Sequence, residues 1–400
     1  MSLGIYISVP FCRTKCSYCN FASDVFSRAV FDRYVDRACL DISSAQQTAQ
    51  EMGGRIEREV DSIYLGGGTP TVLEPDQLLR MFEAVRSHFF VGPEAEITVE
   101  CAPGTLPPAV LDTLLRCGVN RVSLGVQSFI DQEAAAVGRL HKKATVLDDI
   151  SRLRAAGITN INVDLIAGLP HQTVEGWRES LSQTIATGAP HVSVYMLEVD
   201  EDSRLGRELI AGGTRYHAHF VPDEDTTADF YLAACDALER AGIAQYEISN
   251  FARGGSESRH NLKYWTRQPY LGFGVDAHSM LCSSSPTVDA VRFATADSLE
   301  RYVPGAPLQK TEISRTAALE ESFFLGLRLN RGLNLKTLET TFGAQQLAKF
   351  RHVVDEQCEF ELLEQHGGVI RLTPRGRLLS NEVFEAFLTS AHFPDNRVSV

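Results

Sequence analysis

Short β-rich runs alternate with longer helical segments through the first 240 residues or so, and this alternation limits the fold more than any other feature. The predicted strands are 4–9, 62–66, 96–100, 121–126, 160–166 and 191–197. The predicted helices are 27–51, 75–88, 107–116, 144–156, 173–187 and 223–241. Strands separated by helices pair in parallel through right-handed crossovers. Six such units predict an α/β fold, a partial (β/α)6 TIM-like barrel.

The character of the sequence changes after about residue 304. Three helices are expected there, then a hairpin around Gly367-Gly368 and a last helix, which together resemble an α+β winged-helix module. These segments are 316–329, 335–342, 344–358, 360–363 with 369–372, and 377–388. The expected organisation is a partial barrel at 1–215, a barrel extension at 216–304, the winged-helix-like module at 305–390 and a loose tail at 391–400.

Composition bounds the partners and the location of the protein. A formal net charge of −13 argues against broad, charge-driven binding to nucleic acid, so no nucleic-acid partner is expected. The first ten residues lack the basic and apolar regions of a secretory signal, and no apolar stretch is long enough to span a bilayer. Nine cysteines, an odd number, are typical of free thiols in a reducing compartment. These features predict a cytoplasmic protein.

Three of the cysteines, Cys12, Cys16 and Cys19, lie in one short segment with the spacing Cys-x3-Cys-x2-Cys. Three thiolates on a cubane [4Fe–4S] cluster leave one iron without a protein ligand, and that iron can bind a small molecule. Structural zinc normally takes four ligands, often from paired Cys-x2-Cys units. The spacing favours an iron–sulfur cluster but leaves zinc, or no metal, as alternatives.

Other polar or glycine-rich residues end the predicted strands, where the chemistry of parallel βα folds gathers. Cys12 follows the first strand and the turn 66–70 (Gly-Gly-Gly-Thr-Pro) follows the second. Glu100 ends the third strand, Gln127 ends the fourth, and Asp164 lies in the fifth. The glycine turn exposes backbone to a ligand's amino group, or it is only a tight turn. The three side chains could hold an amine or ribose hydroxyls, or could equally cap helices.

Two further side chains are candidates for the same site. Arg139, in Gly138-Arg139-Leu140-His141, could pair with a carboxylate in forked geometry or form a surface salt bridge. Tyr6, on the first strand, could pack beside the cluster or over a ligand, or could fill the barrel.

The motifs taken together resemble the radical S-adenosylmethionine (SAM) superfamily. The resemblance depends on the cysteine triad, the glycine turn, 125–129 (Gly-Val-Gln-Ser-Phe) and 164–170 (Asp-Leu-Ile-Ala-Gly-Leu-Pro). It points to the branch of oxygen-independent coproporphyrinogen III oxidase and the heme chaperones (HemW), and it extends from about residue 5 to 387. The segments most similar to the heme chaperones are 246–253, 258–265 and 372–377.

Two departures from the oxidase favour the heme chaperones. Phe21 stands where the oxidase has a further cysteine, and only eleven residues precede Cys12, too few for the oxidase's N-terminal extension. Two residues also depart from the heme-chaperone pattern: Ala102 replaces the usual Asn, and His171 stands where Gly often follows Pro170.

The resemblance implies a role for each matched residue. Cys12, Cys16 and Cys19 would ligate the cluster, and its open iron would chelate the amine and carboxylate of SAM. Electron transfer from the reduced cluster would cleave SAM to a 5′-deoxyadenosyl radical. The residues expected around SAM are Gly67, Gly68 and Thr69 (methionine moiety), Arg139 (carboxylate), and Glu100, Gln127 and Asp164 (amino group and ribose), with Tyr6 beside the cluster or over the ligand.

The run His260-Asn261-Leu262-Lys263-Tyr264-Trp265 carries the expected heme site. Given the family resemblance, His260 is the candidate heme-iron ligand, since imidazole is a common axial ligand. Tyr264 and Trp265 could stack on the porphyrin. Without the family resemblance, one histidine beside two aromatic residues is more often structural.

The expected function is therefore a heme chaperone that binds a [4Fe–4S] cluster, SAM and heme and delivers heme to an apo-hemoprotein. Its other expected partners are an electron donor, the membrane surface and a second copy of the chain. The alternative is an enzyme that decarboxylates the propionates of coproporphyrinogen III. A chaperone transfers heme without changing it, whereas the oxidase converts a substrate, so whether the protein is an enzyme is left open. A nucleic-acid-binding regulator is a third possibility, which the lack of a basic stripe disfavours.

Overall fold

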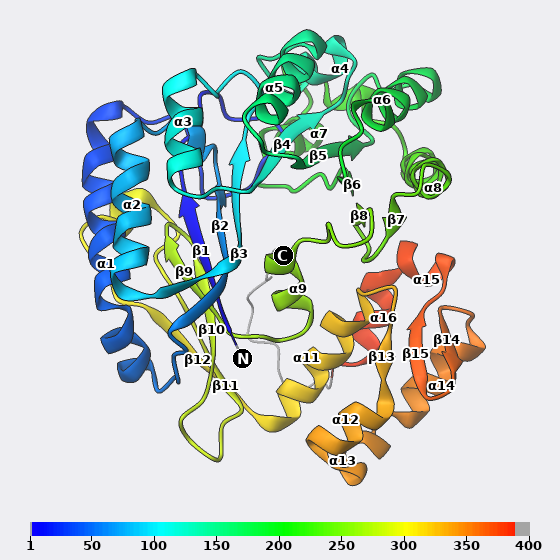
Figure 1. The fold of residues 1–400 in the computed structure, drawn as a ribbon. Coiled ribbons are helices and arrows are strands. Elements are labelled where there is room, and N and C mark those ends of the chain that lie inside the picture. The colour runs from blue at the N-terminus through cyan, green and yellow to red at the C-terminus, as the bar shows by residue number, and fades with distance from the viewer. Residues whose placement is uncertain (1, 389–400) are drawn as a thin grey trace.

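A computed structural model describes residues 2–388 and contains one large, open sheet beside a smaller C-terminal module (Figure 1). The sheet has twelve strands in the order β12-β11-β10-β9-β1-β2-β3-β4-β5-β6-β8-β7. Its first six strands by sequence are parallel neighbours, which confirms the predicted partial barrel. They are β1 (Leu3–Val9), β2 (Glu59–Gly67), β3 (Phe90–Cys101), β4 (Arg121–Gln127), β5 (Asn160–Ala167) and β6 (His191–Met196).

Helices cover the outer face of this sheet (Figure 1). The largest, α1 (Phe31–Met52), buries Tyr34, Ala38, Ile42 and further residues at spacings of three and four, which is the signature of one apolar stripe. The others are α2 (Pro75–His88), α3 (Pro108–Arg116), α4 (Asp131–Ala136), α5 (Lys143–Ala155), α6 (Val174–Thr187) and α8 (Glu224–Arg240). Each predicted helix of this region is present within a few residues of its predicted bounds.

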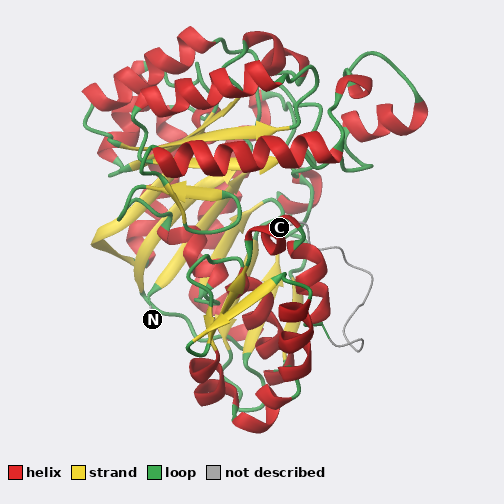
Figure 2. Ribbon diagram, turned by 90° about the vertical axis from the view of Figure 1, so that its right-hand side faces the viewer, coloured by secondary structure: helices red, strands yellow, loops and turns green. Residues whose placement is uncertain are grey.

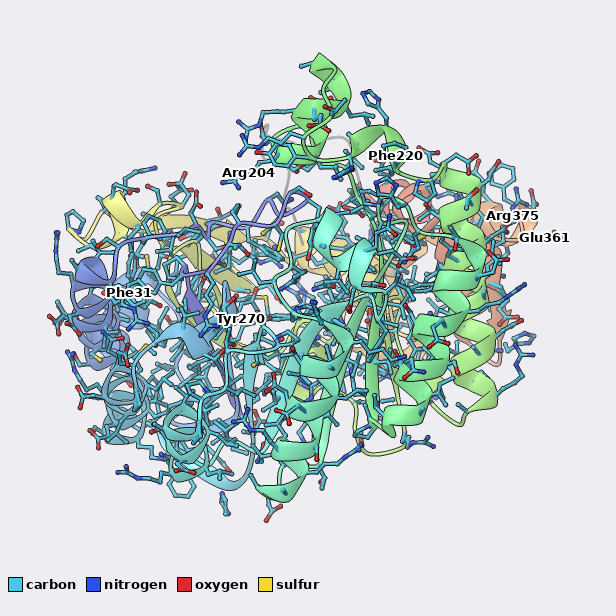
Figure 3. The ribbon with its side chains drawn as sticks, turned by 90° about the horizontal axis from the view of Figure 1, so that it is seen from above. Phe31, Arg204, Phe220, Tyr270, Glu361 and Arg375 are labelled. Atoms are coloured by element: carbon cyan, nitrogen blue, oxygen red, sulfur yellow. The ribbon has the colours of Figure 1, made fainter. Side chains whose placement is uncertain are left out.

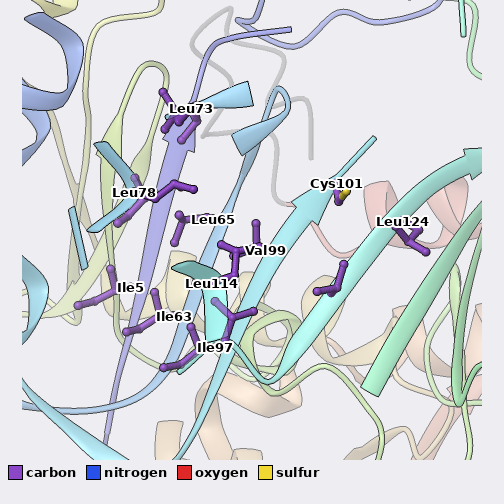
Figure 4. Packing of buried hydrophobic residues seen from close by; sticks show 14 of the residues in the cluster. Ile5, Ile63, Leu65, Leu73, Leu78, Ile97, Val99, Cys101, Leu114 and Leu124 are labelled. Atoms are coloured by element: carbon purple, nitrogen blue, oxygen red, sulfur yellow. The ribbon is translucent and has the colours of Figure 1, made fainter. Parts of the chain in front are cut away.

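The two faces of the sheet differ in chemistry because side chains alternate along a strand. Residues such as Ile5, Ile63, Ile97 and Leu124 point outward into the main hydrophobic core, where helical residues meet them (Figure 4). The residues next to them in sequence face inward and are mostly polar. These inward-facing residues include Tyr6 and Ser8, Ser62 and Tyr64, Glu96 and Glu100, Arg121 and Ser123, Asn162 and Asp164, and His191 and Ser193. A polar inner face is available to bind a ligand.

Strands that were not predicted extend both sides of the parallel core. β9 (Tyr270–Gly274) pairs in parallel with β1, and antiparallel strands continue beyond it. On the other side, β8 pairs with β6 and β7 pairs with β8, both antiparallel. Within residues 2–388 the outermost strands β12 and β7 do not pair, so the barrel stays open. The added strands are β10 (His278–Cys282), β11 (Ala290–Ala294), β12 (Gln309–Ile313), β8 (Asn250–Ala252) and β7 (Ala244–Gln245). The short helices α9 (Arg259–Trp265) and α10 (Leu299–Tyr302) belong to the same region.

Short elements complete the ends of the barrel strands. A projecting segment between β6 and α8 holds α7 (Arg204–Ala211) and the 3-10 helix η3 (Ala218–Phe220) (Figure 2). Two further 3-10 helices, η1 (Arg28–Val30) and η2 (Pro70–Val72), follow the cysteine segment and the glycine turn. None of the helices in residues 2–388 combines the length and apolar character that crossing a bilayer requires.

The C-terminal module has its own hydrophobic core, in which Phe323 and Phe387 stack with their ring centroids 4.5 Å apart. Its three strands form an antiparallel sheet in the order β13-β15-β14. The helices and the small sheet agree with the predicted winged-helix-like module, except that the first hairpin strand covers 363–366 and not the predicted 360–363. Its elements are α11 (Arg315–Leu327), β13 (Leu333–Asn334), α12 (Leu335–Phe342), α13 (Ala344–Ala348), α14 (Arg351–Glu359), β14 (Leu363–His366), β15 (Val369–Leu372), α15 (Pro374–Leu378) and α16 (Ser380–Ala386).

Two predicted helices of this module are each divided in the structure. The expected helix 344–358 breaks between α13 and α14, where Phe350 turns into the core with its ring 5.1 Å from that of Phe323. The expected helix 377–388 is also two helices, and the first begins at Pro374 under an N-cap from the Thr373 side chain. The predicted tail 391–400 lies outside the described residues.

Candidate cofactor site

The cysteine segment forms a loop after β1 that hydrogen bonds hold in place. The Cys12 N–H donates to the Asp24 carbonyl oxygen at 3.0 Å, and the Cys19 N–H donates to the Cys16 carbonyl oxygen at 3.3 Å. The Lys15 ammonium donates to two further carbonyl oxygens of the loop, at 2.7 and 2.6 Å. The loop is therefore closed on itself around the three thiols.

The thiols share one neighbourhood without converging on a single point. Burial raises the pKa of Cys12, and the charges of Cys19 and Cys16 raise it further. The Thr69 hydroxyl donates to Cys12 Sγ at 3.9 Å. Across residues 2–388, no group of three or more His, Cys, Asp or Glu side chains is placed to hold a single metal ion. A cubane takes its thiolates at separate corners, so this donor set fits a [4Fe–4S] cluster better than a mononuclear zinc ion.

The glycine turn packs closely against the neighbouring strands. A Cβ on Gly66 would lie 2.9 Å from the Glu100 carboxyl, and one on Gly68 would lie 2.6 Å from the Phe11 carbonyl oxygen. The Gly68 N–H donates to the Val9 carbonyl oxygen at the end of β1 at 2.8 Å, and the Thr69 N–H donates to the Phe11 carbonyl oxygen just beyond it at 2.7 Å. These two N–H groups are used within the protein, so the turn can bind a ligand's amino group only through its carbonyl oxygens, which accept hydrogen bonds.

Glu100 lies on the inner face with its carboxyl held by two donors. The Tyr64 hydroxyl donates to its Oε1 at 2.8 Å, and the Gly67 N–H donates to the same carboxyl group. Burial raises the pKa of Glu100 to about 7, and the nearby charge of Asp164 contributes to the rise. Tyr6 stands beside this group, with its ring centroid 6.1 Å from that of Tyr64. Two carboxyl groups in a desolvated neighbourhood favour a cationic ligand.

Asp164 belongs to a polar network that crosses three strands. Its carboxylate accepts from the Ser123 hydroxyl at 3.0 Å and from Asn162 Nδ2 at 2.7 Å. The Asn162 amide also contacts the Ser193 hydroxyl, at 3.0 Å. Burial raises the pKa of Asp164, while these hydrogen bonds and the charge of Arg121 lower it. The network therefore fixes the direction in which Asp164 points.

Gln127 and Arg139 lie at the edge of the site next to β4, and each has a buried polar atom without a hydrogen-bond partner. Gln127 has a left-handed φ of 67°, which costs energy for any residue with a side chain, and its Oε1 is buried without a hydrogen-bond partner. Arg139 Nη2 donates to the Tyr18 hydroxyl at 3.0 Å, while its buried Nε has no partner. Gly125 makes room for both, since a Cβ there would lie 3.2 Å from each side chain. Such unpaired, pre-positioned groups fit the polar parts of SAM.

The charge of Arg139 links this side of the site to the cysteine loop. Burial lowers the pKa of Arg139, but the neighbouring Tyr18, Cys16 and Asp164 raise it above its ordinary value overall. The structure thus brings the predicted cluster residues and all predicted SAM residues to one end of the inner face.

His260 lies on α9 against the same inner face, with its ring centroid 5.4 Å from that of Tyr64 and 6.3 Å from that of Tyr6, and it is only 1% exposed. Its Nδ1 is 3.0 Å from the Ser62 hydroxyl and its Nε2 is 2.8 Å from the Tyr264 hydroxyl. Burial lowers the pKa of His260 to about 3, which keeps the imidazole neutral. Neither ring nitrogen is open to iron in this structure, in contrast to the geometry that a heme ligand requires.

Contacts on every side keep α9 in this position. The backbone N–H groups of Arg259 and His260 donate to the Glu96 carboxylate at 3.2 Å each. The buried Lys263 ammonium forms an ion pair with the partly exposed Asp61 carboxylate at 2.7 Å. Iron ligation by His260 would therefore require α9 to leave the sheet.

The aromatic residues of the same run are also engaged. Trp265 is 8% exposed, and the Arg328 guanidinium lies 4.2 Å from its ring centroid. The rings of Tyr264 and Tyr270 meet edge to face, with centroids 4.6 Å apart. The predicted stacking of Tyr264 and Trp265 on a porphyrin does not match these surroundings.

Several residues that shape the site escaped prediction. Tyr18 orients Arg139, Tyr64 orients Glu100, and Ser123 with Asn162 orients Asp164. Arg121 is 2% exposed, its side-chain Nε has no hydrogen-bond partner within residues 2–388, and its charge lowers the pKa of Asp164. For the residues on strands, the available signal was the two-residue period, which puts them on the same face as the predicted ones. Tyr18 lies in the cysteine loop, where no such period exists.

Comparison with known proteins agrees with this geometry. A family model described as the radical SAM superfamily matches residues 6–183, and one described as the HemN C-terminal domain matches residues 313–379. The solved structure of coproporphyrinogen III oxidase (HemN) from Escherichia coli, a radical SAM enzyme, covers 96% of this chain and 90% of that chain with a TM-score of 0.81. Its sequence identity of 24% makes this a likeness of fold.

Two curated relatives match nearly end to end. Heme chaperone HemW of Bacillus subtilis (strain 168) is 33% identical over 96% of this chain and 98% of its own length. Heme chaperone HemW of Synechocystis sp. is 34% identical over 98% of this chain and 97% of its own length.

An open α/β barrel with three cysteines after its first strand defines a radical SAM protein, and membership of this superfamily implies a [4Fe–4S] cluster and SAM. Identity of about a third along almost the whole chain makes the assignment more specific. The chain belongs to the HemW family, as the sequence motifs predicted.

Proposed function

We propose that this protein is a heme chaperone, which binds a [4Fe–4S] cluster, SAM and heme and delivers heme to an apo-hemoprotein. The full-length match to proteins named heme chaperone HemW supports the proposal. The structural observation that carries it is the polar inner face, where three thiols and a set of unpaired polar groups meet at one end of an open barrel. A barrel filled with apolar side chains would leave no room for such cofactors.

At this site, Cys12, Cys16 and Cys19 hold the cluster, which supplies an electron to SAM when both are bound. Backbone groups of Gly67 and Gly68 and the hydroxyl of Thr69 face the methionine part of SAM, with Tyr6 beside it. Arg139 pairs with the carboxylate, because its guanidinium keeps its charge and has an unused Nε. Glu100, Gln127 and Asp164 accept from the amino group and the ribose, each held by its strand.

Enzymatic decarboxylation of coproporphyrinogen III receives less support. Phe21, where the oxidase has a further cysteine, is 65% exposed and supplies no thiol to the loop. The likeness to HemN is one of fold, at 24% identity, whereas the relatives named as heme chaperones are more similar in sequence. The two functions share the cluster and SAM and differ in what happens to the tetrapyrrole.

The deciding experiment incubates the anaerobically reconstituted protein with each candidate substrate. Heme-loaded protein mixed with a b-type apo-hemoprotein should give the absorbance of the holo-acceptor, faster than free hemin at equal concentration. The same protein with SAM, a reductant and coproporphyrinogen III should give no protoporphyrinogen. Protoporphyrinogen formation without heme transfer would reject the chaperone function.

The remaining partners belong to the same proposal. The cluster needs a one-electron donor, and heme delivery needs an acceptor, located in the cytoplasm or at the membrane surface. Flotation with lipid vesicles tests the membrane contact. Light scattering of the purified protein tests a homodimer.

A further inference from the structure

His191 is the first residue of β6, on the inner face of the sheet, and its side chain is 0% exposed. It lies directly opposite Asn162 of β5 in the strand register. β4, β5 and β6 are neighbours in the sheet, and Figure 3 shows the side chains of the barrel from above. His191 Nδ1 is 2.7 Å from Asn162 Oδ1, and its Nε2 is 3.0 Å from the Tyr246 hydroxyl. Both ring nitrogens are therefore engaged, and the ring is fixed in one orientation.

The orientation of the Asn162 amide is set by Asp164. Asn162 Nδ2 lies 2.7 Å from Asp164 Oδ1 and 2.7 Å from the Ser123 hydroxyl oxygen, to which it also donates. The Ser123 hydroxyl in turn donates to Asp164 Oδ2 at 3.0 Å. A carboxylate only accepts hydrogen bonds, so the NH₂ group of the amide faces Asp164 and its oxygen faces away, toward β6. The Asn162 oxygen therefore requires a donor from His191.

This requirement fixes the tautomer of His191. Because Asn162 Oδ1 is an acceptor, the ring proton lies on Nδ1, and Nε2 is left to accept from the Tyr246 hydroxyl. That hydroxyl accepts from the Ser258 N–H at 3.2 Å, so its own proton can be donated to Nε2. Burial and the charge of Arg121 lower the pKa of His191, which keeps the ring neutral. Each group in this chain thus has its donor and acceptor roles set by its neighbours.

The other tautomer of His191 would reverse the order of donors and acceptors. With the proton on Nε2, the Nδ1 lone pair would face Asn162 Oδ1 across 2.7 Å. The amide would have to turn over, and its oxygen would then face the Asp164 carboxylate in place of the NH₂ group. Two acceptors in contact are costly where water does not reach them. The direction of the Asp164 carboxylate therefore depends on a proton on a ring that Asp164 does not touch.

We infer that His191 is a positioning residue for SAM, whose Nδ1–H holds the Asn162 amide so that the amide holds the Asp164 carboxylate in its binding direction. The inference rests on the proposed function, in which Asp164 accepts from the amino group or ribose of SAM. His191 acts through Asn162 and does not contact the ligand. A carboxylate that is already held in place need not be ordered when SAM binds, so the network raises the affinity by pre-organisation.

The test measures SAM binding by calorimetry with the full-length, anaerobically reconstituted protein. His191→Leu removes both ring nitrogens and keeps an apolar side chain in their place. His191→Asn is the conservative variant, because its amide nitrogen stands where Nδ1 stood and can still donate to Asn162. The matched control is Trp177→Phe, which removes a buried hydrogen bond to the Phe230 carbonyl oxygen on α6 and α8, outside the network.

Nitrogen-15 NMR of the histidine-labelled, cluster-free protein gives a second readout, the tautomer itself. The signal of His191 is assigned as the one that His191→Asn lacks. This measurement decides the question even where His191→Leu does not fold.

His191→Leu should bind SAM about tenfold more weakly than the wild type, and His191→Asn should bind it within about twofold of the wild type. Trp177→Phe should lose stability in urea and bind SAM as the wild type does, which separates positioning from a general loss of stability. The His191 signal of the wild type should show the proton on Nδ1.

Three results would overturn the role of His191 while the SAM site stands. They are equal affinity for SAM in His191→Leu and the wild type, equal weakening in His191→Leu and His191→Asn, and a proton on Nε2 in the wild type. A wild-type protein that assembles its cluster and binds no SAM would overturn the proposed function as well.

Discussion

Replacement of Glu100 by glutamine should separate the stability of this protein from its ability to bind SAM. The Glu100 carboxyl is buried on the inner face beside Asp164, and burial raises its pKa from an ordinary 4.5 to about 7. Ionising it in the folded protein is therefore harder than in the unfolded chain. Glutamine keeps the size and one acceptor oxygen for Tyr64 but cannot ionise.

The sign and size of the effect follow from linkage. A carboxyl with a raised folded-state pKa stabilises the fold most below its unfolded pKa, and this contribution is lost as the pH rises through 7. Because the pKa of Glu100 rises from 4.5 to about 7 on folding, the wild type loses about 2.5 kcal/mol of unfolding free energy between pH 5 and pH 8 relative to the glutamine variant. Loss of one hydrogen bond lowers the free energy of unfolding of the glutamine variant by about 1 kcal/mol at both pH values. This loss therefore does not alter the difference between pH 5 and pH 8.

The assay is urea unfolding of the cluster-free protein at pH 5 and pH 8, followed by calorimetric SAM binding to the reconstituted protein. Glu100→Gln should gain stability relative to the wild type on going to pH 8, and it should bind SAM at least about tenfold more weakly. Glu94→Gln, at an exposed position on the same strand, is the matched control and should show neither effect. An identical pH dependence for wild type and Glu100→Gln would refute the reasoning.

Three other variants test separate parts of the site. Gln127→Gly should unfold in urea with about 1 kcal/mol more stability than Gln127→Ala, because only glycine avoids the Cβ penalty at a φ of 67°; equal stabilities would contradict this. Arg139→Lys should weaken calorimetric SAM binding about tenfold, since an ammonium cannot replace a forked guanidinium, and unchanged affinity would count against the assigned role. His260→Ala should cost about 2 kcal/mol in thermal unfolding, by leaving Ser62 and Tyr264 unpaired, yet retain hemin binding in titrations; full stability with lost hemin binding would restore His260 as the ligand.

The parallel core of the fold could be predicted because each unit repeats the same local pattern. Strand β5, for example, is apolar at Ile161, Val163 and Leu165, and Gly157 precedes it after a helix. The convergence of Cys12, Glu100 and Asp164 followed from topology alone, since parallel strands end at one edge.

The extensions of the sheet could not be predicted in the same way. Strands β7 and β8 are two and three residues long and exist only because β6 offers an edge to pair with. The division of the helix around Phe350 likewise depends on a tertiary contact with Phe323 and Phe387. The local sequence pattern does not reveal contacts with residues that are distant in the sequence.

The predicted heme site shows the same limit at the level of single residues. The run around His260 has the composition of a ligand site, but Ser62 and Glu96, which engage it, are far away in the sequence.

The most direct test of the account asks whether the three cysteines carry a cluster with an open iron. Electron paramagnetic resonance is recorded on anaerobically reconstituted, reduced protein, with and without SAM, for the wild type and for Cys16→Ala. The wild type should give a [4Fe–4S] signal that SAM changes, and Cys16→Ala should lose it. Protein that retains zinc or assembles no iron and sulfide, or a cluster signal that SAM leaves unaltered, would contradict the account.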